Sequence, residues 1–191
     1  ADGPNYATGH WLNGRLGGLA TDELIRAVAG DHGVAVAGAD PTQPLVFGVD
    51  SAGVVSARDA LQPVLDASQL AAGDGPDGLR FMLPKPRLAI TVAAGDVVDA
   101  GTPLASRKRP DAAEGSARCA FGYTERERDY LTGTVTAMRL IDGATSGQSS
   151  PLVLDLAGAR GAAERLLAGD GATRETLDLS LPPSLAALEV G

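Results

Sequence analysis

The sequence predicts an α+β fold: a small α/β module over residues 1–86, then a mostly antiparallel β-barrel or sandwich domain with one helix over residues 87–191. The first observation is that the spacing of apolar residues changes near Leu83. Helical spacing dominates before this residue, and two-residue alternation dominates after it. The second is composition. Aromatic residues make up only 4% of the 191-residue chain and glycines number 25, which indicates an aliphatic core and many turns.

Two helices are predicted in the first module. One begins at Thr21, a residue type that caps helices, with Asp22 and Glu23 in its first turn, where carboxylates favour the helix dipole. The other begins at Ser56, with Asp59 three residues on in capping-box position. Pro63 lies inside this second helix, and because proline lacks a backbone donor we expect it to end the first turns or kink them.

Short strands complete the first module. The run PLVFGV (44–49) is one candidate, and residues 69–83 are typical of a hairpin that turns at GDGPDG. The same six residues superficially resemble a calcium loop, but they lack the ordered ligand spacing and the distal Glu of an EF-hand. The prolines of PKPR (84–87) favour an extended connection to the second domain.

Strands dominate the second domain. Cys119, Phe121 and Tyr123 alternate onto one face of a predicted strand, and the stretches around Ala112–Ala117 and Gly143–Ser150 are predicted loops. The sequence runs interpreted as strands are RLAITV (87–92), ARCAFGY (117–123), YLTGTVTAMRL (130–140), PLVLDL (151–156) and TRETLDLSL (173–181).

One helix, GARGAAERLLAG (158–169), is predicted to seal one side or mouth of the barrel. Its inward face comprises Ala159, Ala162, Ala163, Leu166 and Leu167. Its solvent face comprises Arg160, Glu164 and Arg165. The closing strand is expected to direct Leu177, Leu179 and Leu181 toward Leu166 and Leu167.

Charge and composition exclude several classes of function. A net charge of −8 and a pI near 4.7 argue against a nucleic-acid-binding or anionic-membrane surface. No apolar run approaches the roughly 20 residues of a membrane span, so no stable membrane insertion is expected. The single cysteine, Cys119, excludes an internal disulfide and any multi-cysteine metal site. The chain begins at Ala1 without a signal-peptide pattern, and we expect it to be a piece of a longer protein.

The chain shows no motif for catalysis. Its two histidines, His10 and His32, lie in glycine-flanked turns, and no serine lies in a GxSxG context. A Ser–His–Asp arrangement stays open, because triads are assembled in space. The glycines of NGRLGG (13–18) fit neither dinucleotide-binding nor P-loop spacing. We therefore predict no enzyme activity, and no catalytic, cofactor-binding or metal-ligating residue; a small hydrolase is the alternative.

A cofactor-carrier domain is a second alternative. The run VAAGDVVDAGTPLA (92–105) is similar to the turns of biotinyl and lipoyl carrier domains. Such domains carry their cofactor on a lysine at an exposed hairpin tip. The nearest lysines, Lys85 and Lys108, lie outside the predicted hairpin, so the attachment group is missing and no cofactor is predicted.

Three segments in order resemble one known family. They are GHWLNGRLGGLATDELIRAV (9–28), VDSAGVVSARDALQPVLDAS (49–68) and RETLDLSLPPSLAALEVG (174–191). Together they resemble the tail-tip hub protein, also called megatron or host-specificity protein, of gene transfer agents and related siphophages. In that family the closing stretch usually continues as GDVV.

The resemblance implies a structural role in a virion. It implies a homotrimeric baseplate hub beneath the tail tube, in which an α/β insert precedes a β-barrel whose remainder lies beyond Gly191. The implied partners are other copies of the chain and neighbouring tail proteins such as the distal tail and tape-measure proteins, with DNA passing through unbound. The long chains of the family can carry a glycosidase-like barrel, whose signature does not appear in this sequence.

Overall fold

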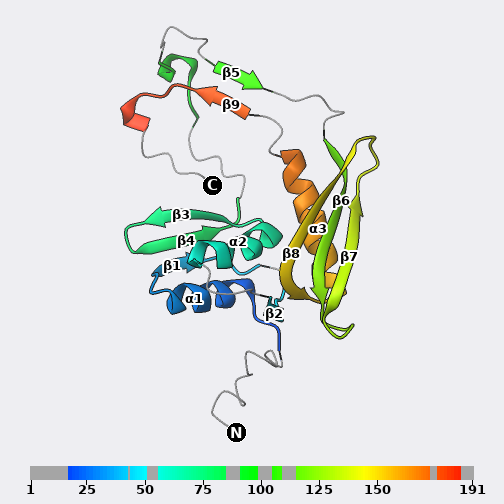
Figure 1. The fold of residues 1–191 in the computed structure, drawn as a ribbon. Coiled ribbons are helices and arrows are strands. Elements are labelled where there is room, and N and C mark those ends of the chain that lie inside the picture. Colours follow the sequence, from blue (N-terminus) through cyan, green and yellow to red (C-terminus); the bar gives the residue numbers. More distant parts are fainter. Residues whose placement is uncertain are drawn as a thin grey trace.

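The computed structural model describes residues 17–42, 44–50, 56–84, 91–98, 105–108, 115–172 and 176–185. Three helices and nine strands lie in these ranges, with short 3₁₀ turns at Ala94–Asp96 and Pro183–Leu185 (Figure 1). The helices are α1 (Thr21–Asp31), α2 (Ala57–Ser68) and α3 (Leu156–Ala172). The strands are β1 (Val36–Ala39), β2 (Gly48–Val49), β3 (Ala71–Gly75), β4 (Gly78–Met82), β5 (Ala105–Lys108), β6 (Ser116–Glu125), β7 (Leu131–Met138), β8 (Ala144–Leu154) and β9 (Thr176–Leu179). The predicted α+β class is confirmed.

Both helices begin near the predicted residues, but only α2 has the predicted cap. The Ser56 hydroxyl accepts the backbone N–H of Asp59 at 3.1 Å and donates to the Asp59 carboxylate at 2.6 Å. Thr21 is the first residue of α1 rather than its cap. Its buried hydroxyl oxygen lies within hydrogen-bond distance of the carbonyl oxygens of Thr42 (3.2 Å) and Pro44 (3.1 Å). The hydroxyl donates to these carbonyls and so links the start of the helix to a neighbouring loop. Helix α2 continues through Pro63 to Ser68, so the expectation that this proline ends the first turns is wrong, while the alternative of a kink stays a prediction.

The predicted hairpin is confirmed as β3 and β4, and it forms a three-stranded sheet in the order β1-β4-β3. Strand β1 joins β4 in parallel. Gly78, at the start of β4, has φ +126°, and a Cβ there would lie 2.6 Å from the carbonyl oxygen of Ala35. Only glycine fits this turn where β4 approaches the chain before β1.

The larger sheet has the order β2-β8-β6-β7. Strands β6 and β7 form a regular antiparallel pair from Arg118↔Met138 to Glu125↔Leu131. Residues 139–143 then cross the start of β6, so that β8 pairs with β6 in parallel on its other side. A Cβ on Gly143 would overlap the carbonyl oxygen of Gly115, and glycine therefore permits this crossing.

Two sequence predictions for this sheet need correction. The predicted loop Gly143–Ser150 is almost entirely the first half of β8, and residues 116–117 of the other predicted loop belong to β6. The pairing is also less antiparallel than expected, because β6 and β8 run in parallel. Pro151 lies where the β6–β8 register shifts between Gly122 and Thr124, a position that tolerates proline in a strand.

Helix α3 packs against the larger sheet (Figure 1). Its predicted inward residues Ala159, Ala162 and Ala163 are fully buried, Leu167 is 4% exposed, and Leu166 packs at the edge of the core. Arg165 differs from its predicted solvent position. Its Nε donates to the carbonyl oxygen of Ala67 at 3.0 Å, which links α3 to the C-terminal end of α2.

The last described strand, β9, pairs with β5 rather than joining the larger sheet. Every residue of β9 is exposed; Leu177 retains 56% and Leu179 38% of its accessible surface. The expected contact of these leucines with Leu166 and Leu167 is therefore wrong. The strands of the described chain form three open sheets and no closed barrel, which corrects the barrel expectation.

One buried cluster joins residues from both sides of the predicted domain boundary. Ile25, Val46 and Leu61 belong to the same core as Phe121 and Leu152, and β2 pairs with β8. The Arg126 guanidinium also lies 4.1 Å from the centre of the Phe47 ring. Residues 85–90, where the boundary is expected, lie outside the described residues. The division into residues 1–86 and 87–191 stays a prediction.

Candidate interaction surfaces

Of the two histidines, the structure describes only His32. His32 follows α1, and its ring Nδ1 lies 2.9 Å from the carbonyl oxygen of Val28, so this nitrogen donates there and closes the helix end. His10 lies outside the described residues. Among the residues that the structure describes, no group of three or more His, Cys, Asp or Glu side chains could hold a metal ion.

The carrier-like run 92–105 is described only in part. Its final residue, Ala105, begins β5, which pairs with β9. Lys108 at the end of β5 lies 3.7 Å from the Asp178 carboxylate, with both side chains well exposed. This lysine is therefore part of a surface ion pair on a two-stranded ribbon.

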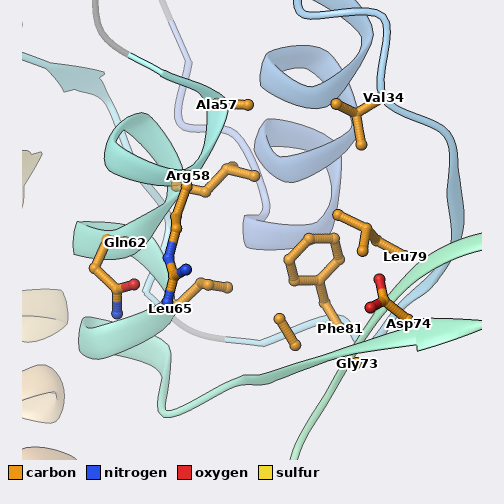
Figure 2. A pocket seen from close by; sticks show the side chains of 11 residues that line it. Val34, Ala57, Arg58, Gln62, Leu65, Gly73, Asp74, Leu79 and Phe81 are labelled. Atoms are coloured by element: carbon orange, nitrogen blue, oxygen red, sulfur yellow. The ribbon is translucent and has the colours of Figure 1, made fainter.

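A pocket of about 440 Å³ lies between α2 and the β1-β4-β3 sheet (Figure 2). Its lining is mainly apolar and includes Leu61, Leu65 and Phe81. Arg58 from α2 and Asp74 from β3 add opposite charges on opposite sides of the pocket (Figure 2). The size is that of a typical binding pocket, and the mixture of apolar lining with a few charged groups is also typical. No sequence motif marked this pocket, because its walls come from separate elements.

A second, smaller pocket of about 280 Å³ adjoins α3 and is lined by Leu45, Asp155 and Arg165, together with small helical residues. Burial lowers the pKa of the Arg165 guanidinium, while the charge of Glu164 acts in the opposite direction. The Nη2 atom of Arg165 is buried without a hydrogen-bond partner in the described chain. The Nε contact with Ala67 accounts for a structural role, since cations stabilise the carbonyl end of a helix.

Large apolar side chains are exposed at both ends of β7. Tyr130 and Leu131 lie at its start, while Met138, Leu140 and Ile141 lie at and beyond its end. Leu140 is fully exposed, at 105% of its reference surface. Between these ends, Thr132, Thr134 and Thr136 are also exposed. Exposed single apolar residues are ordinary, but the group Met138, Leu140 and Ile141 at and beyond the end of β7 indicates a contact surface.

A family model described as "Putative phage tail protein" matches residues 56–191, well over half of the chain, and the chain belongs to this family. It is a structural protein of a phage-type tail, which confirms the resemblance found in the sequence and the predicted virion localisation.

The solved structures that are similar to the chain include one virion chain and two tail proteins. A chain from the virion of a native gene transfer agent particle shares 29% identity with a TM-score of 0.75, and the match covers 98% of this chain and 44% of that one. The 43 kDa tail protein of prophage MuSo2 from Shewanella oneidensis matches at 11% identity and TM-score 0.54, covering 88% and 51% of the respective chains. A tail protein from Neisseria meningitidis MC58 matches at 14% and 0.52, covering 85% and 49%.

The last two similarities, at such low identity, show the fold alone. The chain spans about half the length of each of these structures or somewhat less. No curated protein matches the chain. Within its described residues, no helix has the length and apolarity needed to cross a membrane.

Proposed function

We propose that the chain is the scaffold part of a tail-tip hub, which assembles as a ring of three copies beneath the tail tube and links the tube to the parts that contact the host. The observation that supports this most is the similarity to a chain of the gene transfer agent virion, because it extends over 98% of this chain at 29% identity and a TM-score of 0.75. A hub works by burying protein surface against its neighbours, not by chemistry at one centre.

The surface of the molecule supports such a role. The corner around Leu140 and the apolar pocket beside α2 lie on different elements, so one copy can use both at once. The proposed partners are other copies of the chain and adjacent tail proteins of the distal tail and tape-measure type. The net charge of −8 favours passage of DNA without specific binding, since like charges repel. We propose no catalytic activity for this chain.

Electron microscopy of purified tailed particles tests the proposal. We expect density for this fold at the end of the tail tube, in three copies per particle. Deleting the gene segment should leave particles without an assembled tail tip, and supplying the chain in trans should restore it. Density repeated along the tube, or located in the head, would contradict the hub assignment while leaving the family membership intact.

The hydrolase alternative has a separate test. The purified chain should show no hydrolysis of peptidoglycan above the background of a heat-denatured sample. Activity that disappears on changing His10 or His32 to alanine would support the alternative and refute the non-enzymatic role.

A further inference from the structure

The connection between β7 and β8 holds an apolar side chain in a fixed, fully exposed position. The backbone N–H of Arg139 donates to the carbonyl oxygen of Ala117 at 2.8 Å, and the Arg139 guanidinium donates to the carbonyl oxygen of Leu167. At the other end, the N–H of Ala144 donates to the carbonyl oxygen of Gly115 at 3.2 Å. Leu140 is thus anchored on both sides while its side chain projects into solvent.

Leu140 and its two successors form a compact recognition element, which we call the 140–142 knob. Ile141 is 50% exposed and adds a second branched aliphatic side chain, and the exposed Asp142 adds a negative charge next to them. An anchored loop loses little conformational entropy when it binds, so its apolar area is used efficiently. Nothing in the local fold needs Leu140 to be apolar, because this side chain touches none of the core.

The pocket beside α2 has the matching chemistry. Its apolar lining, with Leu61, Leu65 and Phe81, suits aliphatic side chains, and its volume of about 440 Å³ exceeds what one small side chain would fill. Arg58 supplies a positive charge at the side formed by α2 (Figure 2). Asp74 lies on the opposite side of the pocket, on β3, so an apolar knob followed by an acid matches the α2 side, where the base is (Figure 2).

We propose that the 140–142 knob of one copy inserts into the α2 pocket of a second copy, with Asp142 facing Arg58. The knob follows β7, whereas the pocket is lined by α2, β3 and β4, which lie apart from β7 in the fold (Figure 1). A contact between two different patches is heterologous, and a heterologous contact generates a ring when its rotation closes. The inference rests on the proposed hub and names the contact that would build its ring.

Sedimentation velocity of the wild-type chain over a range of concentrations provides the first test. The wild type should associate as concentration rises. Leu140→Asp should weaken association about tenfold or more, because it places a charge at the centre of an apolar contact. Leu131→Asp is the matched control: this leucine is also exposed, at 61%, but lies at the opposite end of β7, and its change should have little effect.

A mixing experiment distinguishes a heterologous contact from other modes. Ala72→Trp, at an exposed position that lines the pocket, should block the pocket without disturbing the core. Each variant alone should stay monomeric. An equimolar mixture of Leu140→Asp and Ala72→Trp should form dimers and nothing larger, because each variant keeps the one surface that the other lacks. Thermal unfolding curves that match the wild type verify that both variants fold.

The charge pair has its own test. Arg58→Asp and Asp142→Arg should each weaken association, and combining the two changes in one chain should restore most of it. A wild type that stays monomeric at all concentrations, or association unaffected by Leu140→Asp, would overturn the proposed contact. If particles nevertheless carry three copies at the tail tip, the hub survives and only its contact is wrong. Binding of a small molecule or another tail protein in the pocket that leaves self-association unchanged would also overturn it.

Discussion

The layer formed by α3 and the larger sheet differs from the β5–β9 ribbon in how deeply its apolar residues are buried. In the layer, Phe121 and Leu152 are fully buried, with 0% of their surface accessible to solvent. In the ribbon, Leu177 is 56% exposed although it alternates with Thr176 and Asp178 in the two-residue period of a half-buried strand. An isolated two-stranded ribbon is marginally stable in water. Alternation therefore identifies a strand, while the free energy of folding depends on what covers it.

The largest expected effect comes from Phe121→Ala in the buried layer. Removing this ring deletes a large buried apolar group and its stacking with Tyr123, whose centroid lies 6.4 Å away. The free energy of unfolding should fall by about 3–5 kcal/mol. Leu177→Ala in the ribbon should lower it by less than about 0.5 kcal/mol. Denaturant melts of both variants measure the contrast, and similar midpoints would show that the ribbon is covered in solution.

Gly143→Ala should have the next largest effect. A Cβ at residue 143 would overlap the backbone of Gly115, which cannot move without disturbing the β6–β8 pairing. Overpacking of this kind typically costs about 1–3 kcal/mol. Gly147→Ala, in the strand β8 that follows, is the matched control, because its Cβ would meet nothing within 4 Å. Equal thermal midpoints for the two variants would contradict the close crossing of residues 139–143 over β6.

The sequence predicted much of this layer, for reasons that particular residues make clear. Alternation placed Cys119, Phe121 and Tyr123 on one face correctly, because that face is covered by α3. The first half of β8 was predicted as a loop because its residues are polar and small. They form a strand all the same, since the parallel pairing with β6 satisfies their backbone groups. Sequence pattern carries no information about such long-range pairing.

The same limit applies to the candidate surfaces. The pocket combines residues of α2 with residues of β3 and β4, and only the packed structure brings Arg58 and Phe81 to one cavity. Leu140 looked like the last apolar residue of a strand. It lies beyond β7, where the crossing to β8 turns it outward. The family resemblance was found from the order of whole segments. Recognising such an order does not depend on knowing which residues contact each other in the fold.

Ser56→Ala should have a moderate effect confined to the start of α2. The substitution removes the hydroxyl that accepts the Asp59 N–H and so leaves one helix-terminal donor to water. The expected loss is about 1 kcal/mol. Thr42→Ala offers a comparison of another kind, since the Thr42 hydroxyl is buried without a hydrogen-bond partner in the described chain. Its removal should cost less than that of Ser56; a larger cost would mean that Thr42 has a partner, such as a bound water.

The prediction most specific to the buried layer concerns Tyr123 and the dependence of stability on pH. Burial raises the pKa of this phenol, and the charges of Glu125 and Glu127 raise it further. Since an unfolded tyrosine titrates near pH 10, the folded chain holds the neutral phenol more strongly than the unfolded chain does. The resulting stabilisation is fully present below about pH 10 and is lost as pH rises through the folded pKa.

Tyr123→Phe keeps the ring but cannot ionise, so it removes this dependence on pH. Urea melts at about pH 8 and about pH 10.5 should show the wild type losing more stability between the two conditions than the variant loses. The two proteins should differ by only about 1 kcal/mol at pH 8, because one hydroxyl is changed. Parallel losses in both proteins would mean that the phenol is hydrated in the folded state. That result would mean that water reaches the Tyr123 hydroxyl, as it reaches the exposed leucines of β9, although α3 covers this face of the sheet.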